Sequence, residues 1–388
     1  MTPRWWRYFA VEGIYFKLIA WLGILPLQFD WSTRQFSRGN KPFIYSIGMT
    51  VSFAFIIPAM STFLFHSTYQ ANEPIQTLLM VIQYCIVYIF IISAKSLLIW
   101  KSEALCVLLN EILDLRAALE RMAEHLTPDW KYSALVFFKL FVVDALLVTV
   151  TLLTCNDFPE AEVIVKAGNM AYFSLMYIIT LIGDVFVIGL LMCYSVFGAI
   201  NRILKFLTNY GSKEGPVVNV NAALLHLYML HCQTSRIAKQ FSVTMDLVVL
   251  QLCAWYFFMI VYTIYYVYVV LLDKIKNGFI FYDAREYLNP LAYMSIQCSQ
   301  LYFLVITPTI CTERVKKMLP LLNRISEHHS KHHVDRLIEI LTIDHLERDF
   351  IITNNDLYSM NRGLLYGMIT TIGSYVILLV QFHVQREE

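Results

Sequence analysis

Charge is scarce in this chain of 388 residues, of which 15% are Asp, Glu, Lys or Arg and 58% are hydrophobic. Soluble domains hold about 25% charged and about 45–50% apolar residues, so this composition is typical of a membrane protein. The mean hydropathy of +0.56 agrees with that class. The net charge of +1 excludes any whole-chain electrostatic argument for a nucleic-acid partner.

The sequence lacks the motifs that mark disulfide frameworks, zinc sites and common enzymes. Eight cysteines are spread through the chain without a C-x-x-C pair, which excludes a zinc module and a disulfide framework. No nucleophile elbow, phosphate loop or zinc-protease helix is present, so we expect neither an enzyme nor a cofactor. The histidines of 328–333 stand at i, i+4 spacing that can hold a metal, but on a polar stretch without cysteine. We expect a solvated helix start there and no metal site.

Apolar runs long enough to cross a bilayer occur seven times. They predict an all-α membrane protein of seven spans, at about 43–65, 75–99, 133–155, 172–198, 247–272, 288–311 and 363–383. We find no internal repeat, which weighs against a secondary transporter built from two related halves.

Basic residues give the orientation of these spans. Segments on the side of the N-terminus hold 23 Lys and Arg, whereas those on the opposite side hold 5. The positive-inside rule therefore predicts a cytoplasmic N-terminus and an extracellular C-terminus. This polarity is opposite to that of a G-protein-coupled receptor.

The inner segments are long. We expect 1–42 to be a cytoplasmic segment with an amphipathic helix at the inner membrane surface. Helical apolar stripes in the inner segments 103–126 and 331–350 must be buried against other elements. The first carries Leu105, Leu109, Ile112, Leu119, Met122 and Leu126, and the second carries Val334, Leu337, Ile338, Leu341 and Phe350. The polar run 353–356 is expected to end an inner helix and to cap a last helix that starts near 357.

The last span carries a stripe of small and polar residues. Steps of four and three place one set on a single helical face, namely Gly363, Gly367, Thr371, Ser374, Leu378, Gln381 and Gln385. Two interpretations stay open from periodicity alone. The stripe either lines water or packs closely against neighbouring membrane helices.

The same span carries a short motif. Ser374-Tyr375, five apolar residues and then Gln381-Phe382 resemble the closing signature of insect gustatory receptors, in which Thr usually stands at the position of Ser374. The run Leu-Gly-Ile-Leu-Pro-Leu at 22–27 is also similar to that family. The resemblance covers the end of the chain firmly, and elsewhere rests on the order of the spans.

This resemblance implies a ligand-gated cation channel in which four copies of the last helix surround one pore. It also implies a cytoplasmic anchor, 312–356, that joins with the inner extensions 100–132 and 199–246, and a pore helix and tail over 357–388. The gate is then expected at Thr371, Ser374, Leu378, Gln381 and Phe382, where a leucine ring can close a pore by dewetting. Val376 stands where sugar receptors of the family carry an acid, which favours a bitter or other non-sugar ligand.

Aromatic residues gather in the outer halves of the spans within 43–311. They exceed what an interfacial belt needs and suit a pocket for a small, partly polar ligand. The candidate lining is Tyr177, Asp184, Tyr262, Tyr265, Tyr266, Tyr293 and Gln297. Asp144 and Asp184 fall near span midpoints, where each needs a partner, a proton or water. Either they pair within the bundle, for example with Lys139, or one lines the cavity. Lys95 is expected to snorkel toward the inner surface.

The sequence therefore predicts a multi-pass plasma-membrane chemoreceptor that conducts cations. We expect a homotetramer, or a hetero-oligomer with related receptors, opened by a small-molecule ligand within the lipid bilayer. A metabotropic seven-helix receptor and a transporter or embedded enzyme remain as alternatives. A tag on the C-terminus tests the first, and saturable uptake or turnover without unitary currents would indicate the second.

Overall fold

The structure, a computed structural model, describes residues 6–68, 74–122, 129–156, 163–210, 220–277, 285–328, 332–354 and 357–387. Helices make up nearly all of these residues, and two short antiparallel hairpins complete them. In chain order the first half comprises α1 (Trp6–Trp21), β1 (Gln28–Asp30), β2 (Gln35–Ser37), α2 (Asn40–Thr68), α3 (Pro74–Trp100), α4 (Ser102–Met122), α5 (Trp130–Phe137), the π-helical turn η1 (Phe138–Val143) and α6 (Asp144–Asn156).

The second half contains the longest helices. It comprises α7 (Val163–Tyr210), α8 (Val220–Asn277), α9 (Arg285–Lys316), α10 (Met318–His328), α11 (His332–Glu347), β3 (Thr353–Asn354), β4 (Tyr358–Ser359) and α12 (Arg362–Glu387). Seven described segments are long and apolar enough to cross a membrane, and one of them combines α5, η1 and α6. The predicted all-α fold with seven spans is confirmed.

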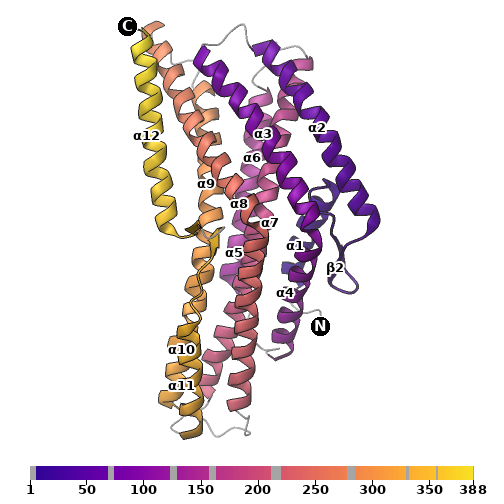
Figure 1. Cartoon of the computed structure of the whole chain (residues 1–388), viewed down its shortest axis with the longest axis vertical. Coiled ribbons are helices and arrows are strands. Elements are labelled where there is room, and N and C mark those ends of the chain that lie inside the picture. Colours follow the sequence, from indigo (N-terminus) through magenta and orange to yellow (C-terminus); the bar gives the residue numbers. More distant parts are fainter. Residues whose placement is uncertain are drawn as a thin grey trace.

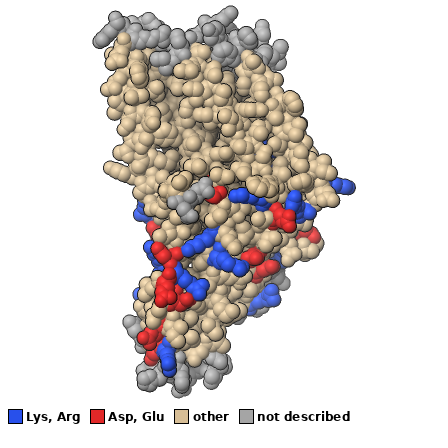
Figure 2. All heavy atoms as spheres, viewed as in Figure 1, with Lys and Arg blue, Asp and Glu red and all other residues tan. Residues whose placement is uncertain are grey.

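Charged residues divide the molecule into two parts. Figure 1 shows the elongated bundle with the C-terminus at its upper end and the N-terminal segment in its lower half. On the face drawn in Figure 2, the described upper part is almost free of charged side chains, whereas Lys, Arg, Asp and Glu gather below it. The upper part is therefore suited to lipid and the lower part to water.

Helix α1 packs into the bundle through several buried side chains. Tyr15, Phe16 and Ile19 are buried in the core, and Glu12 forms an ion pair with Arg116 of α4 at 2.8 Å. The expected one-sided amphipathic pattern is therefore not seen, and the position of α1 at the inner membrane surface stays a prediction. The apolar residues of α1 encircle it too broadly for one lipid-facing side.

The end of α1 explains part of the Leu-Gly-Ile-Leu-Pro-Leu run. Gly23 has a positive φ of 61°, a conformation that costs glycine little. Its N–H donates to Ala20 O at 3.1 Å, and the N–H of Ile24 donates to Ile19 O at 3.0 Å. These two bonds form a Schellman cap, which turns the chain so that Ile24 and the two leucines after it are buried.

The predicted inner stripes are largely buried. In α4 the side chains of Leu105, Leu109, Ile112 and Leu119 lie in the core, but Met122 is exposed, and Leu126 lies outside the described residues. In the second stripe Leu337 is half-buried and the other four members are buried. We call α4, α10, α11 and the lower parts of α7 and α8 the inner bundle (Figure 1).

The polar run 353–356 does not cap the last helix. Thr353 and Asn354 instead pair with Ser359 and Tyr358 in a two-residue hairpin. Helix α12 begins at Arg362, five residues later than expected, because Asn361 supplies the cap: its side-chain oxygen accepts from the N–H of Leu364 at 3.1 Å.

Candidate ligand pocket and pore helix

Four aromatic rings from three helices meet in the outer half of the bundle. The ring centroids of Tyr84 in α3 and Tyr172 in α7 lie 5.3 Å apart in a T-shaped arrangement. Tyr172 contacts Phe173 at 6.1 Å, which contacts Tyr293 of α9 at 6.4 Å. These distances are ordinary for paired aromatic rings. We call Tyr84, Tyr172, Phe173 and Tyr293 the outer aromatic cluster.

Buried polar atoms accompany this cluster. The hydroxyl oxygens of Tyr172 and Tyr293 and the side-chain oxygen of Gln297 are buried and form no hydrogen bond of good geometry among the described residues, although Tyr172 lies beside Gln83 and Tyr293 beside Gln297. A buried polar group without such a bond costs free energy. A ligand that carries a hydroxyl or carbonyl group can offer these atoms the missing bonds.

Only some of the other candidate pocket residues lie at the outer aromatic cluster. Tyr262 of α8 stacks on Phe258 and lies near Tyr84, so it borders the cluster, and Tyr266 follows it one turn along α8. Tyr265 points elsewhere, since its buried ring lies against His383 of α12 at 6.3 Å. Tyr177 is half-buried on α7, farther along the helix than Tyr172.

Asp184 belongs to a buried charged group. Lys139 Nζ lies 2.5 Å from Asp184 Oδ1 and 2.8 Å from Asp144 Oδ1, and all three side chains are buried. Gln300 of α9 donates to Asp144 at 2.9 Å. We call Lys139, Asp144 and Asp184 the buried triad. The pairing of these carboxylates within the bundle, one of the two open interpretations, is what the structure shows.

A π-helical turn makes this pairing possible. Residues five apart in an α-helix point about 140° away from each other. In η1 the N–H of Asp144 bonds to the carbonyl of Lys139, an i to i−5 bond that winds the helix wider. Lys139 and Asp144 thereby reach the same side. The sequence contained both charges but gave no signal for the π-helical turn.

Lys95 does not snorkel. Its side chain is fully buried, its ammonium lies over the ring of Phe53 at 4.6 Å, and it donates to Leu22 O at 3.4 Å. The expectation was wrong because the α1–β1 segment covers this end of α3 and provides a carbonyl acceptor.

Helix α12 lies along one side of the bundle (Figure 1) and is almost unburied. Only 6% of its most apolar membrane-spanning stretch is buried within the chain. It packs on α8 and α9 through a narrow face that includes Ile372 and His383. Every residue of the predicted stripe is exposed, namely Gly363, Gly367, Thr371, Ser374, Leu378, Gln381 and Gln385.

The signature residues take different positions on α12. Ser374 Oγ donates to Thr370 O at 3.1 Å and Thr371 Oγ1 to Gly367 O at 2.8 Å, so both hydroxyls are satisfied within the helix. Tyr375 contacts Phe257 of α8 edge-on at 5.7 Å. Phe382 is exposed like the stripe beside it. The side chains of the histidine cluster at 328–333 lie outside the described residues.

Sequence reasoning missed Tyr84, the α3 member of the outer aromatic cluster. The signal was the polar pair Gln83-Tyr84 within an otherwise apolar run. It also missed that Lys139 serves both carboxyl groups.

Seven membrane helices with a buried charged group, an outer aromatic cluster and an unburied last helix define a multi-pass membrane fold. Solved structures support this class. The insect olfactory receptor OR5 from Machilis hrabei matches with a TM-score of 0.61 at 13% identity, covering 97% of this chain and 98% of that one. The same receptor in complex with eugenol matches with a TM-score of 0.50 at 14% identity, covering 97% and 99%. No curated protein matches the sequence.

The family follows from the sequence itself. A family model described as 7tm Chemosensory receptor matches residues 12–386, which is nearly the whole chain. The chain therefore belongs to the 7tm chemosensory receptor family, and the predicted resemblance is confirmed at the level of this family.

Proposed function

We propose that this chain is one subunit of a ligand-gated, non-selective cation channel that responds to a small organic tastant. The observation that carries the proposal is the exposure of the whole α12 stripe in the single chain. A single helix cannot enclose a pore, so the stripe can line one only when several copies face one another. Four copies, identical or mixed with related receptors, are proposed from the family resemblance.

The inner bundle supports assembly through a second surface. Ile340, Ile343 and Leu346 of α11 are exposed by 57%, 50% and 64%, respectively. Helix α11 lies in the lower part of the bundle (Figure 1), the part in which charged side chains gather on the face drawn in Figure 2. Exposed apolar groups of this kind mark contacts with other proteins. By contrast, Leu341 is buried within the chain and Leu337 is half-buried, so neither is a good candidate for a contact between subunits.

The gate is proposed at Leu378 and Gln381 near the outer end of α12. A ring of leucines can close a narrow pore because water leaves an apolar constriction, and glutamine amides just outside can replace part of a cation's hydration. Thr371 and Ser374 would line the wider inner part.

The decisive test compares two neighbouring exposed residues. Leu378→Ser places a hydroxyl in the stripe, whereas Ile377→Ser makes a similar change about 100° away on the same helix. We expect constitutive current from Leu378→Ser alone, recorded from cells that express each variant. Gln381→Glu should change cation selectivity or block by divalent ions. Parent-like currents from both stripe variants would exclude these residues from the pore.

The ligand is proposed to bind at the outer aromatic cluster, together with Tyr262 and Gln297. The rings provide apolar contact and the buried oxygens provide a few directed hydrogen bonds, which is typical of small-molecule sites. The similar olfactory receptor was solved with eugenol, a small aromatic molecule, and this chain is proposed to take ligands of comparable size. A non-sugar ligand is favoured because Val376 replaces the acid of sugar receptors.

A ligand panel on expressing cells identifies the agonist, and paired variants then test the site. Tyr293→Phe should raise the half-maximal agonist concentration about fivefold or more, because one hydrogen bond contributes about 1 kcal/mol. Tyr302→Phe makes the same change at an exposed position on α9 and serves as the control. Equal dose–response curves for both variants would place the ligand elsewhere.

A further inference from the structure

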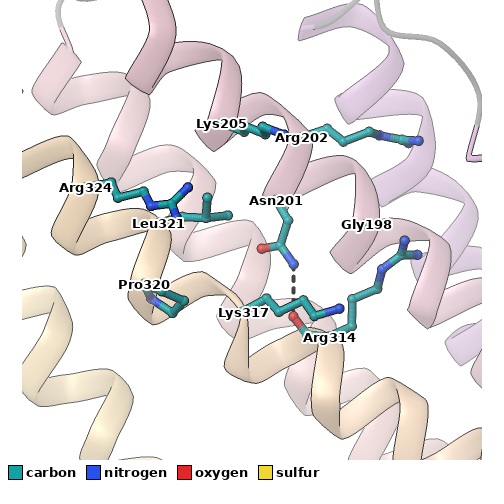
Figure 3. Close-up of a pocket in the computed structure, with 9 residues that line it drawn as sticks. All are labelled: Gly198, Asn201, Arg202, Lys205, Arg314, Lys317, Pro320, Leu321 and Arg324. Carbon is teal, nitrogen blue, oxygen red and sulfur yellow. Dashed lines mark hydrogen bonds between the residues drawn. The ribbon is translucent and has the colours of Figure 1, made fainter.

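A basic pocket lies between the inner parts of α7 and α9–α10, far from the outer aromatic cluster. Figure 3 shows its lining: α7 supplies Asn201, Arg202 and Lys205, and the chain around the α9–α10 junction supplies Arg314, Lys317 and Arg324. The cavity measures about 310 Å³. This volume lies at the lower end of the range of small-ligand sites, about 300–1,000 Å³.

Local structure brings the five cations together. Arg202 and Lys205 are three residues apart and so share one side of α7. Helix α9 ends at Lys316, and Lys317 lies in the turn before α10, where its N–H donates to Arg314 O at 3.3 Å. Asn201 fixes α7 against this turn, since its amide donates to the same carbonyl at 2.9 Å. The pocket is thus part of the packed inner bundle.

Arg314 is held firmly within the chain. It forms an ion pair with Asp129 at 2.5 Å, donates to Tyr194 O at 3.1 Å and stacks over the Tyr194 ring at 3.8 Å. Asp129 is the direct ion-pair partner of Arg314, and its charge also attracts Arg202 from farther away. Its carboxylate cannot neutralise the remainder of the pocket.

The other four cations have no acidic side chain within ion-pair distance among the described residues, although Asp129 attracts Arg202 from farther away. Arg202, Lys205, Lys317 and Arg324 form no ion pair within the part of the chain that the structure describes. Arg202 is only partly exposed, and its Nε is buried without a hydrogen-bond partner among the described residues. Like charges that line one cavity repel one another, and a buried donor without an acceptor costs free energy. An anion in the pocket would relieve both costs.

The position of the pocket indicates which kind of anion can reach it. Glu313, next to Arg314, pairs with Arg362 at 3.0 Å, and Arg362 is the first residue of the membrane helix α12. The upper rim of the pocket therefore lies where α12 enters the membrane, on the inner side by the charge count. Basic pockets between helices at this level bind phosphorylated lipid headgroups. Guanidinium groups pair with phosphate bidentately, whereas the two lysines act as point charges.

We propose that this pocket binds a multiply phosphorylated anion of the inositol phosphate class, presented as the headgroup of an inner-leaflet phosphoinositide or as the free inositol phosphate. Several phosphates are needed because Lys205, Lys317 and Arg324 have no acidic partner among the described residues, and Asp129 compensates Arg202 only in part. The proposal concerns binding on the inner side and does not depend on the pore assignment.

The test uses the full chain, purified in detergent, and three probes. Inositol trisphosphate represents the free anion, dioctanoyl phosphatidylinositol bisphosphate represents the lipid, and dioctanoyl phosphatidylserine represents a lipid of lower charge. Isothermal titration measures binding of each probe to the parent and to two double variants. Lys317→Gln/Arg324→Gln removes two pocket cations, and Lys316→Gln/Arg336→Gln removes two exposed cations that do not line the pocket.

We expect the pocket variant to weaken binding of a phosphorylated probe by at least about tenfold, because two charge-assisted contacts are lost. The control variant should bind within about twofold of the parent. Binding of inositol trisphosphate identifies a site that accepts the free anion, and binding of the phosphorylated lipid alone identifies a headgroup site that needs the acyl chains.

Three results would overturn the proposal. They are no binding of either phosphorylated probe, equal loss in both double variants, and phosphatidylserine binding as tight as that of the phosphorylated lipid. Gel filtration of each variant shows whether the fold and oligomer are kept. If the pocket variant is misfolded, Lys205→Gln, an exposed single change on α7, replaces it with the same expected direction.

Discussion

Helices α7 and α12 are both apolar membrane spans, yet they lie in opposite surroundings. The most apolar stretch of α7 is 94% buried within the chain, whereas that of α12 is 6% buried. Mean hydropathy does not distinguish them well, at 2.3 for α7 and 1.8 for α12. The difference shows that hydropathy identifies a membrane-spanning helix but does not predict whether protein or lipid surrounds it.

The two helices also differ in what their polar residues do. Asp184 of α7 forms an ion pair with Lys139 inside the chain. The amide of Gln381 in α12 faces outward, toward lipid or another subunit. A lipid-facing glutamine is costly. Helix α7 therefore stabilises the single chain, whereas the outward face of α12 fits the proposed contact with other subunits.

The largest expected effect comes from removing Lys139, the counter-ion of Asp184 in α7. Lys139→Met leaves Asp144 and Asp184 without their shared ammonium in an apolar interior, which costs about 3–5 kcal/mol. We expect most of the protein to be lost from the folded fraction in detergent, measured by fluorescence-detected gel filtration. Asp144→Asn should be milder, because Lys139 keeps Asp184. A Lys139→Met variant as abundant and heat-stable as the parent would mean that the buried triad does not stabilise the fold.

The second largest effect is expected from a Gly→Ala substitution, compared between α7 and α12. A Cβ at Gly189 of α7 would overlap the fully buried ring of Phe241, whereas a Cβ at Gly373 of α12 meets nothing within 4 Å. Gly189→Ala should therefore lower stability by about 1–3 kcal/mol. Gly373→Ala should be neutral or raise stability slightly, because alanine favours helix. The melting temperature of the purified oligomer measures both. A matching loss at Gly373 would reveal close packing of α12 against another subunit.

Much of this fold was predictable because its signals are local. The seven spans, the buried stripe of α4 and the common face of the α12 stripe follow from hydropathy and from spacing of three and four residues. The features that were missed depend on distant contacts or on unusual backbone. The burial of Lys95 needs Leu22, 73 residues away. The Lys139–Asp144 pair needs a π-helical turn, for which no residue type is diagnostic.

The candidate site was predictable in part for the same reason. Periodicity identified which α12 residues share a face, but not whether that face meets water. Tyr262, Tyr293 and Gln297 were chosen by helix position and lie at or near the outer aromatic cluster. Tyr265 was chosen in the same way and faces α12, because adjacent residues on a helix point about 100° apart. Sequence position alone could not separate these two directions.

The third effect concerns the surface by which subunits are proposed to meet. Ile343→Ser removes an exposed apolar side chain from α11, and Val107→Ser does the same on α4, whose position is distant from α11 and α12 in Figure 1. Burial of one such side chain contributes about 1.5–3 kcal/mol, less when it stays partly exposed. We expect Ile343→Ser to shift the oligomer toward smaller species in mass photometry. Equal mass distributions for the two variants would move the subunit contact away from α11.

The smallest effect depends on pH and acts at the inner end of α7. His345 of α11 is half-buried, its ring lies 5.3 Å from that of His231, and His231 contacts Phe197 of α7 at 5.1 Å. Burial lowers the pKa of His345 below its usual 6.5, and the neighbouring Asp344 carboxylate opposes that shift only in part. The neutral ring is thus favoured in the folded state.

The sign of the effect follows from this lowered pKa. As pH falls below about 6.5, the unfolded chain protonates His345 first, so the unfolded state binds more protons and gains stability relative to the folded state. The stabilising contribution is complete above about pH 6.5 and is lost as pH falls through the lower pKa of the folded state. His345→Gln removes this titration, so its melting temperature should fall less than that of the parent between about pH 7.5 and about pH 5.5. His226→Gln makes the same substitution at an exposed position on α8 and should keep the parent's slope. The difference is expected to be small because solvent screens a half-exposed ring, and identical slopes for all three proteins would show that protonation of His345 does not loosen the packing at the inner end of α7.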